Sequence, residues 1–255
     1  MHSMNGWPGY GSPWRRYPHR VGGPRLRLFC APCRAARRPE RPGRRRSTYA
    51  ANVQIRTGYG LARAELDGPG SPDFLLVLTH GSAGGVDTPD LLAVRDTAVQ
   101  LGGAVARVLQ PYRVRGARAP GSAARQDAAW LEIISVLRAR YAGLPLVQGG
   151  RSNGARVACR TARAAGARAV LALAFPLHPP GRPERSRAAE LREAGTAVLA
   201  VSGDRDAFGV PGSADAGQVV VLPGETHALS RNPAAVGDAV RAWLPEALAL
   251  PRPAR

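Results

Sequence analysis

Lysine is absent from this sequence: all 36 basic residues among its 255 are arginine. Cysteine is scarce, with three residues, and no apolar run approaches the roughly 20 residues that a membrane-spanning helix needs. So few, scattered cysteines exclude a disulfide framework and predict a reducing, cytoplasmic location. We therefore expect no membrane partner, and the length suits one α/β domain with an appendage.

The positive charge is unevenly distributed. Of the formal net charge of +18, residues 1–47 carry +11, because they hold 12 arginines against Glu40 alone, which leaves +7 for the rest. This segment is also rich in proline and glycine and lacks apolar periodicity, which predicts a disordered arm. We expect the folded domain at 48–250 and a short tail at 251–255. Nucleic acid is expected as a partner only through the basic arm.

The remaining composition indicates no metal or cofactor. Cys30 and Cys33 form one C-x-x-C pair in the arm, but a zinc site would need two more ligands, and only His19 is near. We therefore predict no metal. The sequence gives no indication of oligomeric state.

The hydrophobic pattern after the arm is that of a parallel sheet. Alternating positions at 53–55 and 62–66 predict two short edge strands joined near Gly58 and Gly60. The run at 74–79 is apolar throughout, as in a strand buried on both faces. Similar runs recur at 104–109, 144–147, 169–174, 197–202 and 218–222.

Helical signals separate these runs. Thr88 and Pro89 begin one helix, a second carries Trp130 on its apolar face, and Asn232 and Pro233 begin the last. Strands alternating with helices predict a doubly wound, mostly parallel α/β sheet. The stretch at 175–186 is too short to form a large lid.

Residues 150–154, Gly-Arg-Ser-Asn-Gly, match the G-x-S-x-G pattern of a nucleophile elbow. They follow the strand predicted at 144–147 and precede a helical stretch at about 153–165. A tight strand-to-helix turn with glycine flanks would hold the Ser152 hydroxyl clear of the backbone. The alternative is that Ser152 only caps a helix in a glycine-rich loop.

A nucleophilic serine needs a base and an acid, which follow it in the order Ser, Asp, His in this kind of fold. His227 is the one histidine after the strand at 197–202. Asp204 and Asp206 both follow that strand, and we prefer Asp206 because it lies farther into the loop. Asp204 stays open as the acid.

A glycine-rich turn at 80–85 follows the strand at 74–79. Its Ser82 or Ala83 backbone N–H, with that of Asn153 after the nucleophile, would form an oxyanion hole.

Three further side chains are candidates for substrate binding: His80, Tyr112 and His178, each placed after a predicted strand. For His80 the alternative is that it orders its own loop, and for Tyr112 that it lies in a solvated loop.

Six sequence blocks, in order, resemble a known family. The blocks are LTHGSAGG, QPYRVRGARAP, GGRSNGAR, FPLHPPGRP, SGDRDAFG and ETHAL. Through them the sequence is similar to the dienelactone-hydrolase-like α/β-hydrolases of actinobacteria over residues 50–248. It resembles most closely the branch that includes the hydrolase-like domain of a non-specific-lethal chromatin complex subunit and a testis-expressed relative.

The resemblance implies that Ser152 is the nucleophile, Asp206 the acid and His227 the base, with the turn at His80 and Gly81 and Asn153 shaping the oxyanion hole. We expect this reaction to require no cofactor. Dienelactone hydrolase itself would use a cysteine at the position of Ser152, which argues against that activity. We expect a serine hydrolase acting on an ester or related acyl bond of a small substrate. The alternative is a hydrolase-fold scaffold that binds a partner without catalysis.

Overall fold

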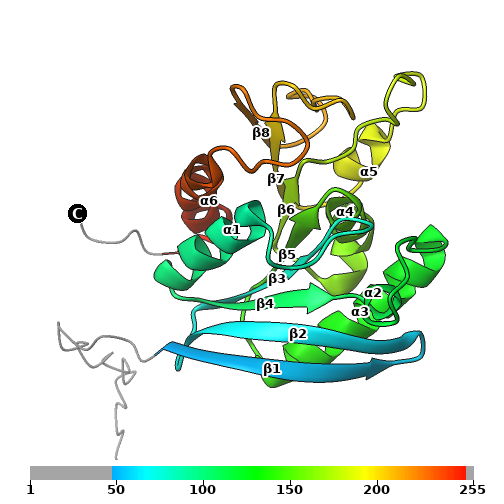
Figure 1. Ribbon diagram of the computed structural model, residues 1–255. Coiled ribbons are helices and arrows are strands. Elements are labelled where there is room, and N and C mark those ends of the chain that lie inside the picture. The colour runs from blue at the N-terminus through cyan, green and yellow to red at the C-terminus, as the bar shows by residue number, and fades with distance from the viewer. Residues whose placement is uncertain (1–47, 251–255) are drawn as a thin grey trace, which may run out of the picture. The chain divides into compact units, whose positions relative to one another are not determined.

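The computed structural model describes residues 48–250. The predicted arm, its cysteine pair and the tail lie outside the described residues. Within them, one sheet is covered by helices on both faces (Figure 1), which confirms the predicted doubly wound α/β architecture. No helix of the described part is long and apolar enough to cross a membrane.

The sheet has eight strands in the order β1-β2-β4-β3-β5-β6-β7-β8. The β1–β2 and β2–β4 pairs are antiparallel and all the others are parallel. The strands are β1 (Thr48–Thr57), β2 (Gly60–Pro69), β3 (Phe74–Thr79), β4 (Gly103–Leu109), β5 (Leu146–Arg151), β6 (Ala169–Leu173), β7 (Ala197–Gly203) and β8 (Gln218–Leu222).

The first two strands correct the prediction of two short edge strands. Each has ten residues, and only β1 is at the edge, because β2 pairs with β1 on one side and β4 on the other. Ala62, Ala64 and Leu66 are buried on one face of β2, as the alternation predicted. Pairing along the full hairpin extends both strands beyond the apolar positions.

The predicted strand at 144–147 is also wrong in its limits. In the structure β5 begins at Leu146 and continues through Gly149 and Gly150 to Arg151. Glycine has a low strand propensity, but here the backbone is held in a parallel ladder with β3 on one side and β6 on the other. Tertiary pairing therefore extends the strand to the residue before Ser152.

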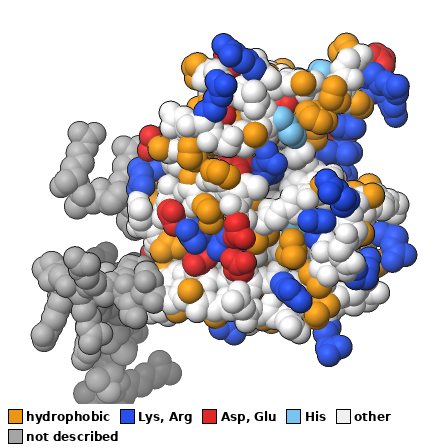
Figure 2. Space-filling model, in the orientation of Figure 1, with side chains coloured by type: hydrophobic (Ala, Val, Ile, Leu, Met, Phe, Trp, Pro, Cys, Tyr) orange, Lys and Arg blue, Asp and Glu red, His pale blue; other side chains and the backbone are white. Residues whose placement is uncertain are grey.

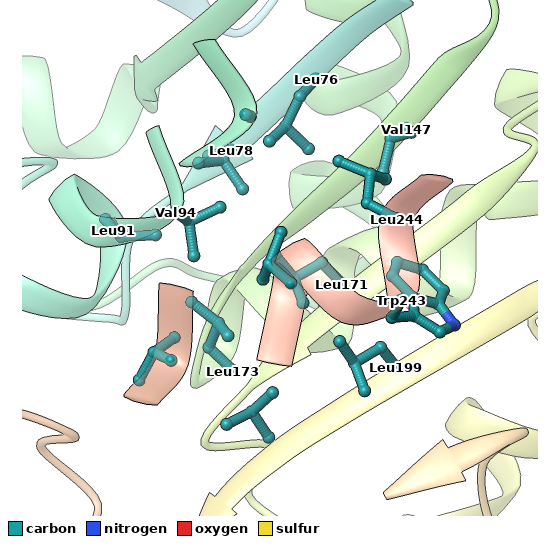
Figure 3. Close-up of a cluster of buried hydrophobic side chains, with 14 of the residues drawn as sticks. Leu76, Leu78, Leu91, Val94, Val147, Leu171, Leu173, Leu199, Trp243 and Leu244 are labelled. Atoms are coloured by element: carbon teal, nitrogen blue, oxygen red, sulfur yellow. The ribbon is translucent and has the colours of Figure 1, made fainter. Parts of the chain in front are cut away.

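Two helices cover one face of the sheet and three cover the other. α1 (Pro89–Gln100) and α6 (Pro233–Ala247) pack on one face, where their leucine and valine side chains meet those of the central strands (Figure 3). α3 (Ala123–Arg140), α4 (Asn153–Ala165) and α5 (Ala188–Arg192) pack on the other. A four-residue helix, α2 (Pro111–Val114), follows β4.

The strand order places a topological switch point between β3 and β5. The chain passes from β3 to β4 on one side, then crosses to β5 on the other side of β3. At such a switch point the loops that follow the two strands diverge and leave a gap beyond their carboxyl ends, where open α/β sheets bind ligands. The loop after β3 and the turn after β5 therefore both begin at this switch point.

Trp130 provides a test of the packing between α3 and the sheet. Its side chain is fully buried, and its indole N–H donates to Gln148 Oε1 of β5 at 2.9 Å. Trp130→Ala should lower the free energy of unfolding by about 3–5 kcal/mol, because it removes a large core side chain and leaves a cavity. Denaturant unfolding measures the change. Val136→Ala, at an exposed position of the same helix, should keep the free energy of unfolding within about 0.5 kcal/mol of the parent value. An equal loss in both variants would contradict this account.

Candidate active site

Ser152 stands between the last residue of β5 and the first residue of α4 in a strained conformation. Its φ of 54° and ψ of −116° lie in a region that residues with a side chain rarely adopt. Such a conformation costs on the order of 1–3 kcal/mol and persists only where the surroundings impose it. Here the Ser152 N–H donates to Leu173 O at 2.9 Å, continuing the β5–β6 ladder into the turn.

The two glycines of the pentapeptide allow a close backbone approach. A Cβ atom on Gly150 would lie 2.5 Å from Thr79 O, and one on Gly154 would lie 2.7 Å from His80 O. Both distances are too short for any side chain, and the opposing atoms are main-chain atoms that cannot move aside. The turn therefore packs directly on the end of β3, as a nucleophile elbow requires.

Three loops bring Ser152, His227 and Asp206 together. His227 Nε2 lies 2.9 Å from Ser152 Oγ, and His227 Nδ1 lies 2.8 Å from Asp206 Oδ2. An ionised carboxylate only accepts hydrogen bonds, so Nδ1 carries the proton and Nε2 is free to accept the serine proton. Serine, base and acid thus form one continuous chain of hydrogen bonds.

The two aspartates after β7 have different partners. Asp206 is buried, and its second oxygen accepts the Phe208 N–H at 2.8 Å, so both oxygens are engaged. Asp204 is exposed and accepts the Gly224 N–H at 2.8 Å, which links two loops. Of the two, the structure places Asp206 against His227.

The loop after β3 also lies against the nucleophile turn. A Cβ atom on Gly81 would lie 3.3 Å from Ser152 Cβ, so the next residue, Ser82, lies close to the elbow. The Ser82 and Asn153 backbone N–H groups have no acceptor among residues 48–250. Asn153 is also the first residue of α4, where the helix dipole favours negative charge.

The prediction that His80 binds substrate is wrong. Its side chain is fully buried, Nδ1 donates to Gly81 O at 2.7 Å, and Nε2 accepts the Gln110 N–H at 3.0 Å. Burial lowers the pKa of His80 to about 4, so the ring stays neutral near pH 7. Its nitrogens order the loop after β3, the alternative role considered for it.

Tyr112 is also buried, and its hydroxyl donates to Ser82 O at 2.9 Å. It lines a cavity of about 30 Å³ beside Gln126, which has room for one or two water molecules and not for a substrate group. Tyr112 therefore supports the loop that carries Ser82.

His178 is half-buried, and its backbone N–H donates to Phe208 O at 2.9 Å, which places it beside the loop of Asp206.

Sequence reasoning missed three residues that hold this site. Gln126 Oε1 accepts from the Asn153 side-chain amide at 2.6 Å, and the Phe208 ring lies over the His227 ring with centroids 4.2 Å apart. Arg151, inside the pentapeptide, donates to the His227 carbonyl. Phe208 and Arg151 belong to the family-like blocks, whereas no sequence signal singles out Gln126.

A hollow of about 500 Å³ lies over β1, β2 and β4, and neither Ser152 nor His227 lines it. Acidic and basic side chains gather over β2 and β4 (Figure 2). Arg107 there is buried and pairs with Glu65 at 2.6 Å and Asp87 at 2.7 Å. These ion pairs join β2, β4 and the loop after β3, and we assign the hollow no chemistry. Residues 48–250 contain no cluster of side chains suited to a metal ion.

Comparison with known proteins identifies the family of this chain. The model of the family described as Alpha/beta hydrolase domain matches residues 72–223, more than half of the chain. The chain therefore belongs to the α/β-hydrolase family. A search of curated proteins found no match.

Solved structures share the fold at low identity. Est1E from Butyrivibrio proteoclasticus is 18% identical with a TM-score of 0.64, covering 78% of this chain and 99% of that one. A dienelactone hydrolase from Anabaena variabilis is 17% identical with a TM-score of 0.64, covering 79% and 99%. XC6422 from Xanthomonas campestris, described as a serine hydrolase without lid, is 18% identical with a TM-score of 0.60, covering 80% and 97%. The α/β-hydrolase fold expected from the sequence is confirmed.

The buried neutral His80 predicts a specific acid sensitivity. Its pKa is lowered in the folded state, from 6.5 to about 4, so between these pH values the unfolded chain binds more protons. The contribution of neutral His80 to the free energy of unfolding is complete above pH 6.5. It is lost as pH falls toward 4, by up to about 3 kcal/mol. Denaturant unfolding across this range should show a steeper loss in the parent than in His80→Gln, which does not titrate. Parallel pH profiles would contradict the assignment.

Proposed function

We propose that this α/β-hydrolase is a serine hydrolase that cleaves an ester or related acyl bond of a small substrate. The observation that carries the proposal is the hydrogen-bond chain from Ser152 Oγ through His227 to Asp206, with distances of 2.9 and 2.8 Å. Its members follow the strands in the order usual for this fold. The strained backbone of Ser152 supports the same assignment, because strain of this kind concentrates at functional sites.

In the proposed reaction Ser152 Oγ attacks the acyl carbon while its proton passes to His227 Nε2. Asp206 keeps His227 in the required tautomer and stabilises the imidazolium that forms. The negative charge on the former carbonyl oxygen is held by the Ser82 and Asn153 N–H groups. The tetrahedral intermediate collapses, and the leaving group departs with the proton from His227.

A water molecule then hydrolyses the acyl-enzyme by the same proton transfers in reverse. It gives a proton to His227 Nε2, its oxygen attacks the acyl carbon of the acyl-enzyme, and Ser152 leaves with that proton. The acid product is released and the free serine is restored. This scheme uses no metal and no organic cofactor.

Two observations bear on which residue is the nucleophile and which bond is cleaved. Cys159 lies two helical turns beyond Ser152, is almost fully buried, and burial raises its pKa to about 12, so it is not a competing thiolate. The similar structures include an esterase domain from Rhodothermus marinus and Est1E with ferulic acid bound. The likeness to an esterase domain favours an ester substrate. His178, beside the Asp206 loop, is the remaining candidate for contacting it.

The resemblance to the chromatin-complex branch carries the second candidate, a scaffold that binds a partner without catalysis. The hydrogen-bonded arrangement of Ser152, His227 and Asp206 favours the enzyme.

A cytoplasmic location and an association of the basic arm with nucleic acid stay as proposals. Salt-dependent nucleic-acid binding that disappears when residues 1–47 are removed would support the latter.

A fluorophosphonate probe, which reacts covalently with activated serines, separates the two candidates. The parent protein should be labelled, and Ser152→Ala should lose all labelling while it stays folded. Ser213→Ala, at an exposed position, is the matched control and should label like the parent. No labelling of the parent, or labelling that survives in Ser152→Ala, would refute the proposal. A panel of p-nitrophenyl esters of increasing acyl length then defines the acyl group.

The two neighbouring aspartates provide a matched pair of substitutions. Asp206→Asn should lower kcat on a p-nitrophenyl ester by about 10⁴-fold, because the amide no longer fixes the His227 tautomer. Asp204→Asn removes the same charge two residues away and should leave kcat within a few-fold of the parent. The assignment of the acid is wrong if Asp204→Asn causes the larger loss.

A further inference from the structure

We propose that Arg151 is a positioning residue that holds His227 in register with Ser152, an inference that rests on the proposed function. Arg151 directly precedes the nucleophile in the pentapeptide. Its side chain contacts two partners that are distant in sequence: the carboxylate of Asp90 and the backbone carbonyl of His227. One guanidinium thus joins the nucleophile turn, the start of α1 and the loop of the base.

The contacts of Arg151 are short and shielded from solvent. Its Nε lies 3.0 Å from Asp90 Oδ2, and its Nη2 lies 2.7 Å from His227 O. The Asp90 side chain is fully buried and that of Arg151 is 15% exposed. Asp90 lies in the first turn of α1, directly after the loop that carries Ser82. The arginine therefore joins the nucleophile turn to the His227 loop and to the segment that follows the Ser82 loop.

Arg151 links the main chain of His227 directly to the nucleophile turn. Asp206 and Ser152 contact the imidazole ring, whereas Arg151 contacts the main chain of the same residue. Fixing the main chain limits the positions of the ring relative to Ser152 Oγ. Displacements of about 1 Å at a reacting centre can lower a rate by about 100-fold, so this contact bears on catalysis.

The ion pair with Asp90 serves two purposes in this arrangement. It fixes the guanidinium at a second point, and it neutralises a positive charge that would otherwise oppose the imidazolium formed at His227. A buried ion pair is weak grounds for stability, because apolar residues of similar volume often replace one without loss. Asp90 Oδ1 has no hydrogen-bond partner within residues 48–250, so this pair is not arranged for maximal stability.

Arginine is suited to this position because its planar fork presents several N–H donors in fixed directions. Nε and Nη2 point to different partners at the same time. A lysine would keep the charge but would supply a single nitrogen to reach both Asp90 and the His227 carbonyl.

The test separates positioning from stability with a pair of variants. Arg151→Met removes both contacts and leaves Asp90 as a buried unpaired charge, so both the melting temperature and the rate of fluorophosphonate labelling should fall. Asp90→Leu combined with Arg151→Met removes the unpaired charge as well. In the double variant the melting temperature should recover toward that of the parent, while labelling stays about 10- to 100-fold slower.

Arg160→Met is the matched control. Arg160 lies on α4, is 17% exposed and pairs with Asp127 at 2.6 Å, but it has no contact with His227. Its loss should lower the melting temperature and leave the labelling rate within about two-fold of the parent.

Arg151→Lys covers the case in which the double variant does not fold. It keeps the charge beside Asp90, and labelling should be slowed at a nearly unchanged melting temperature.

Two outcomes would overturn the inference. One is a labelling rate that recovers together with the melting temperature in the double variant. The other is a folded Arg151→Lys protein that labels at the parent rate. With an ester substrate, kcat should carry the loss while KM stays within about two-fold. If the parent itself is not labelled, the proposed function fails, and that result is distinct from parent-like labelling in the Arg151 variants.

Discussion

The close contact between the nucleophile turn and the end of β3 is the constraint on which the rest of the site depends. Gly150 and Gly154 lie so near Thr79 and His80 that no side chain fits at either position. The contact forces Ser152 into a conformation that is unfavourable in isolation, and its N–H bond to Leu173 O helps to hold it there. Strand pairing on both sides of β5 supplies the rigidity that this strain requires.

The positions of the other groups follow from this contact. Parallel strands end at the same edge of the sheet, so the loops after β3, β5, β7 and β8 converge there. His80 is neutral and fully buried, and its two ring nitrogens hold the loop after β3 beside the elbow. Tyr112 donates to the backbone carbonyl of Ser82, and Gln126 accepts from the side-chain amide of Asn153. They thereby hold the two residues whose N–H groups we propose for the oxyanion hole.

Much of the site could be found from the order and spacing of residue types. The pattern at 150–154, with a strand before and a helix after it, located Ser152, and His227 was the one histidine in the right interval. The choice between Asp204 and Asp206 depended on loop geometry, which two residues of spacing constrain only weakly. The role given to His80 was wrong because a histidine after a strand can face the crevice or the core, and the sequence reads the same in both cases.

Residues that act through other residues were beyond sequence reasoning. Gln126 is 27 positions from Asn153, and Phe208 stacks on a histidine 19 positions away, so neither contact leaves a local pattern. Arg151 was visible as a member of the pentapeptide. The chain uses arginine at every position where lysine could also supply a charge, so arginine at one position signals little. Its two partners, Asp90 and His227, lie 61 and 76 residues away.

By itself the sequence determined the doubly wound α/β fold and the order of the residues proposed for catalysis. Both depend on patterns that are local or sequential: apolar periodicity, helix caps, a glycine-flanked serine, and the succession of strands. Only the tertiary structure decided which aspartate meets His227, that β5 extends through two glycines, and that Arg151 joins the nucleophile to the base. Those outcomes depend on packing between segments far apart in the chain, where distances of a few tenths of an ångström decide which hydrogen bonds form.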